Sequence, residues 1–128
     1  MNLSQTDALR AYARMMNTLD ARHIEPLLAE NFHYSSQWVF AEIASKQEYL
    51  DYIRPKLEAI AKSGAKVYAE MAVLEGWGGD PCVVMAQGNP SNLVATVLAK
   101  VDGGHITRFD MGMVPAPEEA TRSGKYPA

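Results

Sequence analysis

The sequence has little cysteine and no long apolar run. Cys82 is the single cysteine in 128 residues, so no intrachain disulfide and no cluster of several thiolates around a metal can form. No stretch of about 18 apolar residues occurs, which argues against a membrane-spanning helix. Basic residues number 12 against 15 acidic ones, and a net charge of −3 does not favour a nucleic-acid surface. We therefore expect a cytoplasmic protein with neither a nucleic-acid nor a membrane partner.

Several motifs that carry chemistry are also missing. The sequence contains no His-x-x-x-His or His-Glu-x-x-His pair, which would indicate a metal site. It contains no Gly-x-Gly-x-x-Gly or phosphate-binding loop, and no Gly-x-Ser-x-Gly around a nucleophilic serine. The sequence therefore predicts no metal and no cofactor.

The apolar content is 48%, and a chain of this length can bury a core of its own without staples. Helical periodicity changes to strand alternation along the chain, which predicts the order α-α-β-α-β-β-β-β of an α+β domain. The predicted helices are residues 5–19, 21–29 and 46–62, and the predicted strands are residues 32–40, 66–75, 82–87, 93–101 and 105–114. We expect one domain over residues 1–114. Residues 115–128 are rich in proline, and we expect a tail that is weakly ordered or ordered only against a partner.

Local signals mark where several of these elements begin and end. Ser4-x-x-Asp7 and Ser45-x-x-Glu48 are capping boxes at the starts of two helices. Gly64 suits a left-handed helix end, and Asp102-Gly103-Gly104 is typical of a tight hairpin turn. Pro55 lies inside the helix over residues 46–62, where it predicts a kink or a break.

The element order resembles the nuclear transport factor 2-like superfamily, which includes SnoaL-like polyketide cyclases and ketosteroid isomerases. The resemblance covers about residues 5–114. It implies a cystatin-like cone, in which a curved, mostly antiparallel sheet wraps around helices. It is carried by the strand over 32–40, the helix after Ser45, the final hairpin over 99–110 and six residues of the first helical pair: Tyr12, Asn17, Asp20, Ile24, Leu27 and Ala29.

The resemblance implies a ligand in the open mouth of the cone, between sheet and helices. On the ketosteroid isomerase pattern, the tyrosine donor falls on Tyr12, the general-base aspartate on Ser36 and the second acid on Val97. The chain keeps the phenol and lacks both acids, so the candidate catalytic residues are Tyr12 and Ser36. The residues expected to line the ligand site are Tyr12, Met16, Tyr34, Ser36, Trp38, Tyr52, Val97, Phe109, Met111 and Met113.

Some of these side chains have a plain alternative. Aromatic and methionine side chains at helical or strand spacing also form ordinary core, and this stays open for Tyr12 and the methionines. His33 is either a general base that pairs with a carboxylate or a half-exposed strand histidine. Cys82 heads a strand, where we expect an inert, buried thiol.

Two functions are compatible with the sequence. The first is a small-molecule-binding domain whose apolar pocket takes a small aromatic or alicyclic ligand, with a SnoaL-like lyase, isomerase or cyclase reaction left open. The second is a non-catalytic module for dimerisation or protein interaction. The resemblance implies a homodimer that forms through the outer face of the sheet, where Arg108 and Asp110 are expected.

Overall fold

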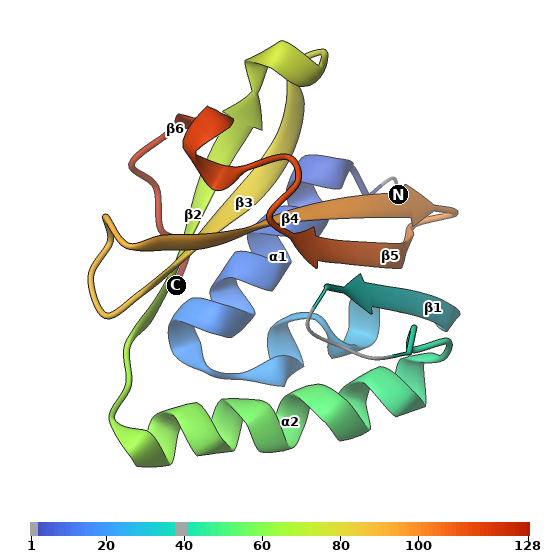
Figure 1. Ribbon diagram of the computed structural model, residues 1–128. Coiled ribbons are helices and arrows are strands. Elements are labelled where there is room, and N and C mark those ends of the chain that lie inside the picture. Colours follow the sequence, from blue (N-terminus) through green and yellow to red (C-terminus); the bar gives the residue numbers. More distant parts are fainter. Residues whose placement is uncertain (1–2, 38–40) are drawn as a thin grey trace.

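The structure is a computed structural model that describes residues 3–37 and 41–128, with all their side chains except that of residue 77. Two α-helices, α1 (Gln5–Thr18) and α2 (Lys46–Ser63), combine with one mixed sheet (Figure 1). The strands are β1 (Leu28–Ser36), β2 (Val67–Leu74), β3 (Asp80–Gln87), β4 (Leu93–Asp102), β5 (His105–Gly112) and β6 (Thr121–Arg122).

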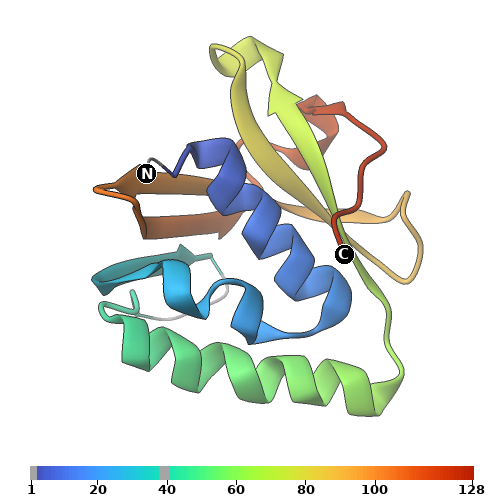
Figure 2. The same ribbon diagram turned by 180° about the vertical axis from the view of Figure 1, so that it is seen from behind.

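The sheet has the strand order β1-β5-β4-β3-β2-β6. β1 and β5 are parallel, and every other neighbouring pair is antiparallel. The sheet curves around α1, which contacts β2, β3 and β4, while α2 packs against β1. Figures 1 and 2 both show α1 between the sheet and α2. The predicted α+β architecture, a curved sheet wrapped around helices, is therefore confirmed.

Both helices begin and end where the sequence indicates. The Asp7 N–H donates to Ser4 Oγ at 3.0 Å, and the Ser4 N–H donates back to Asp7 Oδ2 at 3.1 Å. Ser45 Oγ accepts from the Glu48 N–H at 3.1 Å, and Gly64 ends α2 with φ +74°. These contacts satisfy backbone groups that a helix end otherwise leaves without partners. In the described part of the chain, neither helix has both the length and the apolarity needed to cross a bilayer.

The predicted break at Pro55 does not occur, because α2 runs through it as one helix. A proline leaves the carbonyl four residues earlier, here that of Asp51, without its helical partner. Both residues lie on the exposed side of α2, so water can bond to that carbonyl.

The predicted helix over residues 21–29 is wrong in type and length. The chain instead forms two short 3-10 helices, Ala21–His23 and Glu25–Leu27. Pro26 has no N–H to donate, and its ring would clash with an α-helical backbone that had begun at residue 21. β1 then begins at Leu28, four residues before the predicted strand. Residues 38–40 of that predicted strand lie outside the described residues.

The predicted hairpin at residues 102–104 is confirmed, since Gly103 and Gly104 have φ +59° and +81° and join β4 directly to β5. A bulge near the start of β5 then inserts Thr107 as an extra residue between the pairs Val101–Ile106 and Lys100–Arg108. Because of this insertion, both Ile106 and Phe109 are fully buried.

The C-terminal segment, residues 115–128, does not form the weakly ordered tail that the sequence predicted. It lies along the outer face and edge of the sheet, where β6 pairs with β2 and Pro117 is buried. The Glu70 carboxylate, with only 3% of its side chain exposed, accepts from Arg122 Nε at 2.6 Å and from the Gly124 N–H at 2.7 Å. Asn17 of α1 donates to the Pro127 carbonyl at 2.7 Å. The prediction missed this order because these partners are 52 to 110 residues apart in sequence.

We predict that Arg122→Met destabilises the protein by about 2–4 kcal/mol, because it leaves the buried Glu70 carboxylate without its cation. Urea unfolding at neutral pH measures the loss. The control is Arg14→Met, which removes an exposed α1 arginine that forms no ion pair within the described chain. Equal stability of the two variants would contradict the role given to the Glu70–Arg122 pair.

Candidate functional site

A cavity of about 540 Å³ opens where the ends of β1, β3, β4 and β5 meet α2. This volume is in the range of sites that bind small molecules. The described residues that line it are Ser36, Lys56, Gln87, Leu93, Val94, Met111 and Met113.

Irregular strand pairing places these side chains together. Ser36 and Met111 are partners in the parallel β1–β5 register. On the other side of the cavity, a bulge in the β3–β4 ladder inserts Val94 between the residues that pair with Met85 and Ala86. The bulge interrupts the strand alternation, and as a result the consecutive residues Leu93 and Val94 both reach the cavity.

A line of aromatic and polar contacts leads from the cavity into the protein. Lys56 Nζ donates to the Tyr52 hydroxyl at 3.2 Å and lies 5.5 Å from the centre of the Tyr52 ring. The Tyr52 ring in turn lies 5.6 Å from that of Tyr34. The Tyr34 hydroxyl donates to Met111 Sδ at 3.4 Å, which brings the line back to the cavity wall.

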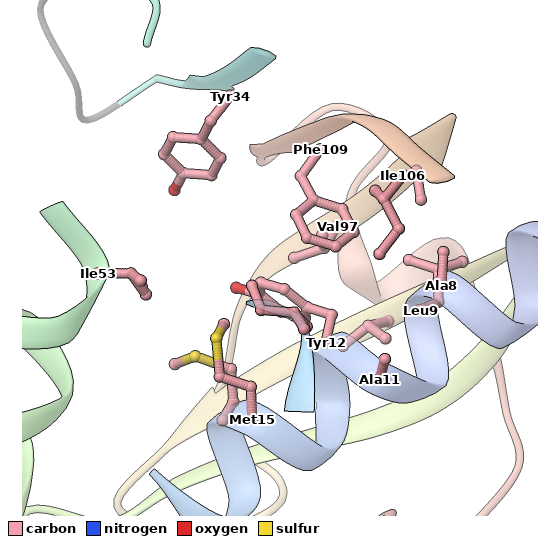
Figure 3. Packing of buried hydrophobic residues seen from close by; sticks show 14 of the residues in the cluster. Ala8, Leu9, Ala11, Tyr12, Met15, Tyr34, Ile53, Val97, Ile106 and Phe109 are labelled. Atoms are coloured by element: carbon pink, nitrogen blue, oxygen red, sulfur yellow. The ribbon is translucent and has the colours of Figure 1, made fainter. Parts of the chain in front are cut away.

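The interior behind this wall is filled by aromatic rings. Phe109 packs edge to face against Tyr12 at 5.0 Å and against Phe32 at 5.5 Å, and Phe32 packs in the same way on Tyr49 at 5.0 Å. Such pairs add to the free energy that burial alone provides. In Figure 3 the hydroxyls of Tyr12 and Tyr34 point into the same interior space.

The buried phenols stay protonated at neutral pH. Burial is the main cause that raises the pKa of Tyr12 and Tyr49 well above 10, and nearby tyrosines add to it. Burial, followed by the neighbouring Tyr52, also raises the pKa of Tyr34. None of these three hydroxyls is therefore a base that could take a proton from a ligand at pH 7.

The structure places the predicted site residues in three groups. Ser36, Met111 and Met113 line the cavity, while Tyr34 and Tyr52 form the aromatic wall beside it. The second group, which is buried in the core and does not line the cavity, consists of Tyr12, Val97 and Phe109. The third group is Met16 alone, which is buried and borders a different cavity of about 410 Å³ near Tyr68 and Tyr126. Trp38 lies outside the described residues.

No family model matches the sequence, and no curated protein matches it. Solved structures do match. A nuclear transport factor 2-like protein of Cytophaga hutchinsonii has a TM-score of 0.60 at 16% identity, over 87% of this chain and 90% of its own. A candidate ketosteroid isomerase of Kribbella flavida has a TM-score of 0.58 at 16% identity, over 97% and 83%. A candidate polyketide cyclase of Sinorhizobium meliloti has a TM-score of 0.55 at 18% identity, over 82% and 93%.

The chain has the nuclear transport factor 2-like fold. At these identities the likeness establishes the fold alone, so any function must be argued from the chain's own residues.

Four residues that line the cavity were not predicted from the sequence. Lys56 follows Tyr52 by four positions on α2, a spacing that places the two side chains together on one helix face. Gln87, Leu93 and Val94 lie on either side of the turn that joins β3 to β4, next to the ends of the strands predicted over residues 82–87 and 93–101. The Tyr-x-x-x-Lys spacing and the hairpin ends were thus the available signals.

Residues on the outer face of the sheet lie away from the cavity, as the sequence predicted. Arg108 pairs with Asp110 at 2.9 Å and with Glu42 at 2.7 Å, and the other Glu42 oxygen lies 2.8 Å from His33 Nδ1. His33 is half-exposed and pairs with the Glu42 carboxylate, but this pair lies away from the cavity. Burial raises the pKa of Cys82 to about 11, so this thiol stays protonated at pH 7. Within the described residues, no three His, Cys, Asp or Glu side chains could hold a metal ion.

We predict that Tyr49→Phe stabilises the protein by about 1 kcal/mol at pH 7, because the buried Tyr49 hydroxyl has no hydrogen-bond partner among the described residues. Its raised pKa also makes wild-type stability fall above about pH 10, where Tyr49 ionises in the unfolded chain but stays protonated in the fold. The variant should lose less stability over that range. Urea unfolding at pH 7, 9 and 10.5 measures both effects, with Tyr68→Phe as the control; a loss of stability at pH 7 would contradict the assignment.

Proposed function

We propose that the protein binds a small, largely apolar molecule, aromatic or alicyclic, in the 540 Å³ cavity. The residues that line the cavity support this proposal. Leu93, Val94, Met111 and Met113 supply apolar surface, and three polar side chains, Ser36, Lys56 and Gln87, supply a few hydrogen-bonding groups. A mostly apolar wall with a few polar groups is typical of sites for small organic ligands.

Apolar contact would supply most of the affinity. Each 100 Å² of ligand surface removed from water contributes about 2.5 kcal/mol. The two methionines can adapt their side chains to ligands of different outline. The chain shares its fold with a candidate polyketide cyclase and a candidate ketosteroid isomerase, but their activities are not carried over to this chain.

A lyase, isomerase or cyclase reaction stays a prediction. Among the described residues that line the cavity there is no carboxylate. A serine hydroxyl such as that of Ser36 is too weak a base to take a carbon-bound proton at neutral pH without a strong partner. We therefore propose binding and assign no residue to proton abstraction.

The test is to fill the cavity with a larger side chain. Met113→Trp adds an indole at the cavity wall, and we expect it to abolish binding of small aromatic and alicyclic compounds. Wild type should gain roughly 5 °C in Tm at a ligand concentration of ten times Kd, as measured by thermal unfolding. The matched control is Ala59→Trp, which places the same ring at an exposed position of α2 outside the lining.

Two outcomes would contradict the binding function. One is a broad panel of such compounds that leaves the wild-type Tm and calorimetric heats unchanged. The other is a ligand that binds Met113→Trp as tightly as it binds wild type and Ala59→Trp.

We also propose a homodimer that forms through the outer face of the sheet beside β1 and β5. Val114 favours it, because this apolar side chain is 83% exposed next to Ser35 and Asp110 on that face. The charged residues on this face would contribute little to the contact, since Arg108 already pairs with Asp110 and Glu42 of its own chain. The contact would therefore be largely apolar.

We predict that wild type sediments as a dimer and that Val114→Asp weakens dimerisation at least tenfold, because the change buries an unpaired charge in the contact. Sedimentation equilibrium over a range of concentrations measures the dissociation constant. Glu118→Gln, an exposed change in the C-terminal segment, is the control. A wild type that stays monomeric at millimolar concentration would refute the dimer.

A further inference from the structure

Lys56 gives the cavity a positive charge that no described group of the protein neutralises. It is the one charged side chain among the described residues of the lining. The ion pairs between described residues involve Arg10, Arg22, His33, Arg54, Arg108 and Arg122, and none involves Lys56. An ammonium group at the wall of a partly apolar cavity favours a ligand that brings a negative charge.

The contacts of Lys56 hold its ammonium group at this wall. One N–H donates to the Tyr52 hydroxyl at 3.2 Å, and the ammonium lies 5.5 Å from the centre of the Tyr52 ring. Tyr52 is fixed in turn by its packing against Tyr34 and Tyr49. An ammonium has three N–H donors, so two are left to donate to a ligand.

We infer that the ligand is an apolar acid, whose ring or chain lies against Val94, Met111 and Met113 and whose carboxylate accepts hydrogen bonds from Lys56. This inference rests on the proposed binding function. Gln87 can add a neutral amide donor at the same cavity. A monoanionic carboxylate matches the charge of one ammonium, whereas a phosphate dianion would leave a second negative charge without a cation.

A neutral ligand fits the lining less well. It would take the Lys56 ammonium partly out of water and return no charge to it, and such desolvation costs free energy. A cationic ligand would add repulsion to that cost. The expected order of affinity is therefore acid, then amide, then amine for ligands with the same apolar body.

The experiment uses three probes of nearly equal shape: 2-naphthoate, 2-naphthamide and 2-naphthylmethylamine. Isothermal titration calorimetry on wild type at pH 7 should give a Kd for the naphthoate roughly five- to tenfold below that of the amide. The amine should bind most weakly. Raising the salt concentration should reduce this preference for the acid, because ions screen the charge of a partly exposed pair.

Lys56→Gln should remove the preference for the acid while the naphthamide still binds. The matched control is Lys62→Gln, which makes the same charge change on the exposed side of α2, away from the cavity lining. Lys62→Gln should keep the wild-type order of the three probes.

The outcomes separate the two proposals. If amide and acid bind wild type equally, or if Lys56→Gln keeps the preference for the acid, the inference is wrong and the binding function stands. If Lys62→Gln removes the preference as well, the effect comes from overall charge and the inference is again wrong. If no probe binds wild type at millimolar concentration, the binding function fails for this class of ligand, and the inference fails with it.

Discussion

The packing of α1 against the curved sheet decides which part of the interior the protein's own side chains fill. Tyr12 and Met15 of α1 meet Val97, Ile106 and Phe109 of the inner sheet face, and together they fill the interior with hydrocarbon and aromatic rings (Figure 3). Protein interiors are close-packed, so these side chains occupy the space between α1 and the inner face of the sheet. The cavity of about 540 Å³ lies at the rim, where the strands end and α2 faces them. The site is therefore built from strand ends, a bulge and one helix face, and less from the centre of the sheet.

The C-terminal segment also constrains the structure, because it packs on the outer face of the sheet. Ala72, Leu74, Cys82 and Val84 form a small apolar cluster there, and Ala120 of the C-terminal segment packs against it. The buried Glu70 carboxylate fixes this segment through Arg122, and Asn17 of α1 bonds to both Ala69 and Pro127. The segment thus ties the edge strand to the central helix. It also covers part of the outer face of the sheet over β2 to β4.

The fold could be predicted from the sequence because its signals are local. Capping residues Ser4 and Ser45, the turn at Gly103 and the change from helical to strand periodicity all act within a few residues. The sequence predictions were wrong where contacts between residues far apart in the sequence determine the structure. Glu70 and Arg122 are 52 residues apart, and no local pattern indicates that they pair. The exact lining of the cavity depends on the β3–β4 bulge at Val94, and a single inserted residue shifts every side chain beyond it.

The same difference between local and long-range signals explains which site residues could be predicted from the sequence. Ser36 and Met111 follow from strand alternation, since each is the last inward-facing residue of its strand before the rim. Lys56 was missed because an amphipathic reading of α2 assigns charged residues to solvent, although a lysine can extend its hydrocarbon stem along an apolar wall.

The position of Lys56 at the cavity wall affects which chemistry the cavity can support. On the isomerase pattern the acids would stand at Ser36 and Val97, yet Ser36 offers a hydroxyl and Val97 is buried core. Tyr34 is held protonated by burial and Lys56 carries a positive charge, so the groups at and beside the cavity mostly donate hydrogen bonds. Hydrogen-bond donors of this kind stabilise negative charge that develops near them.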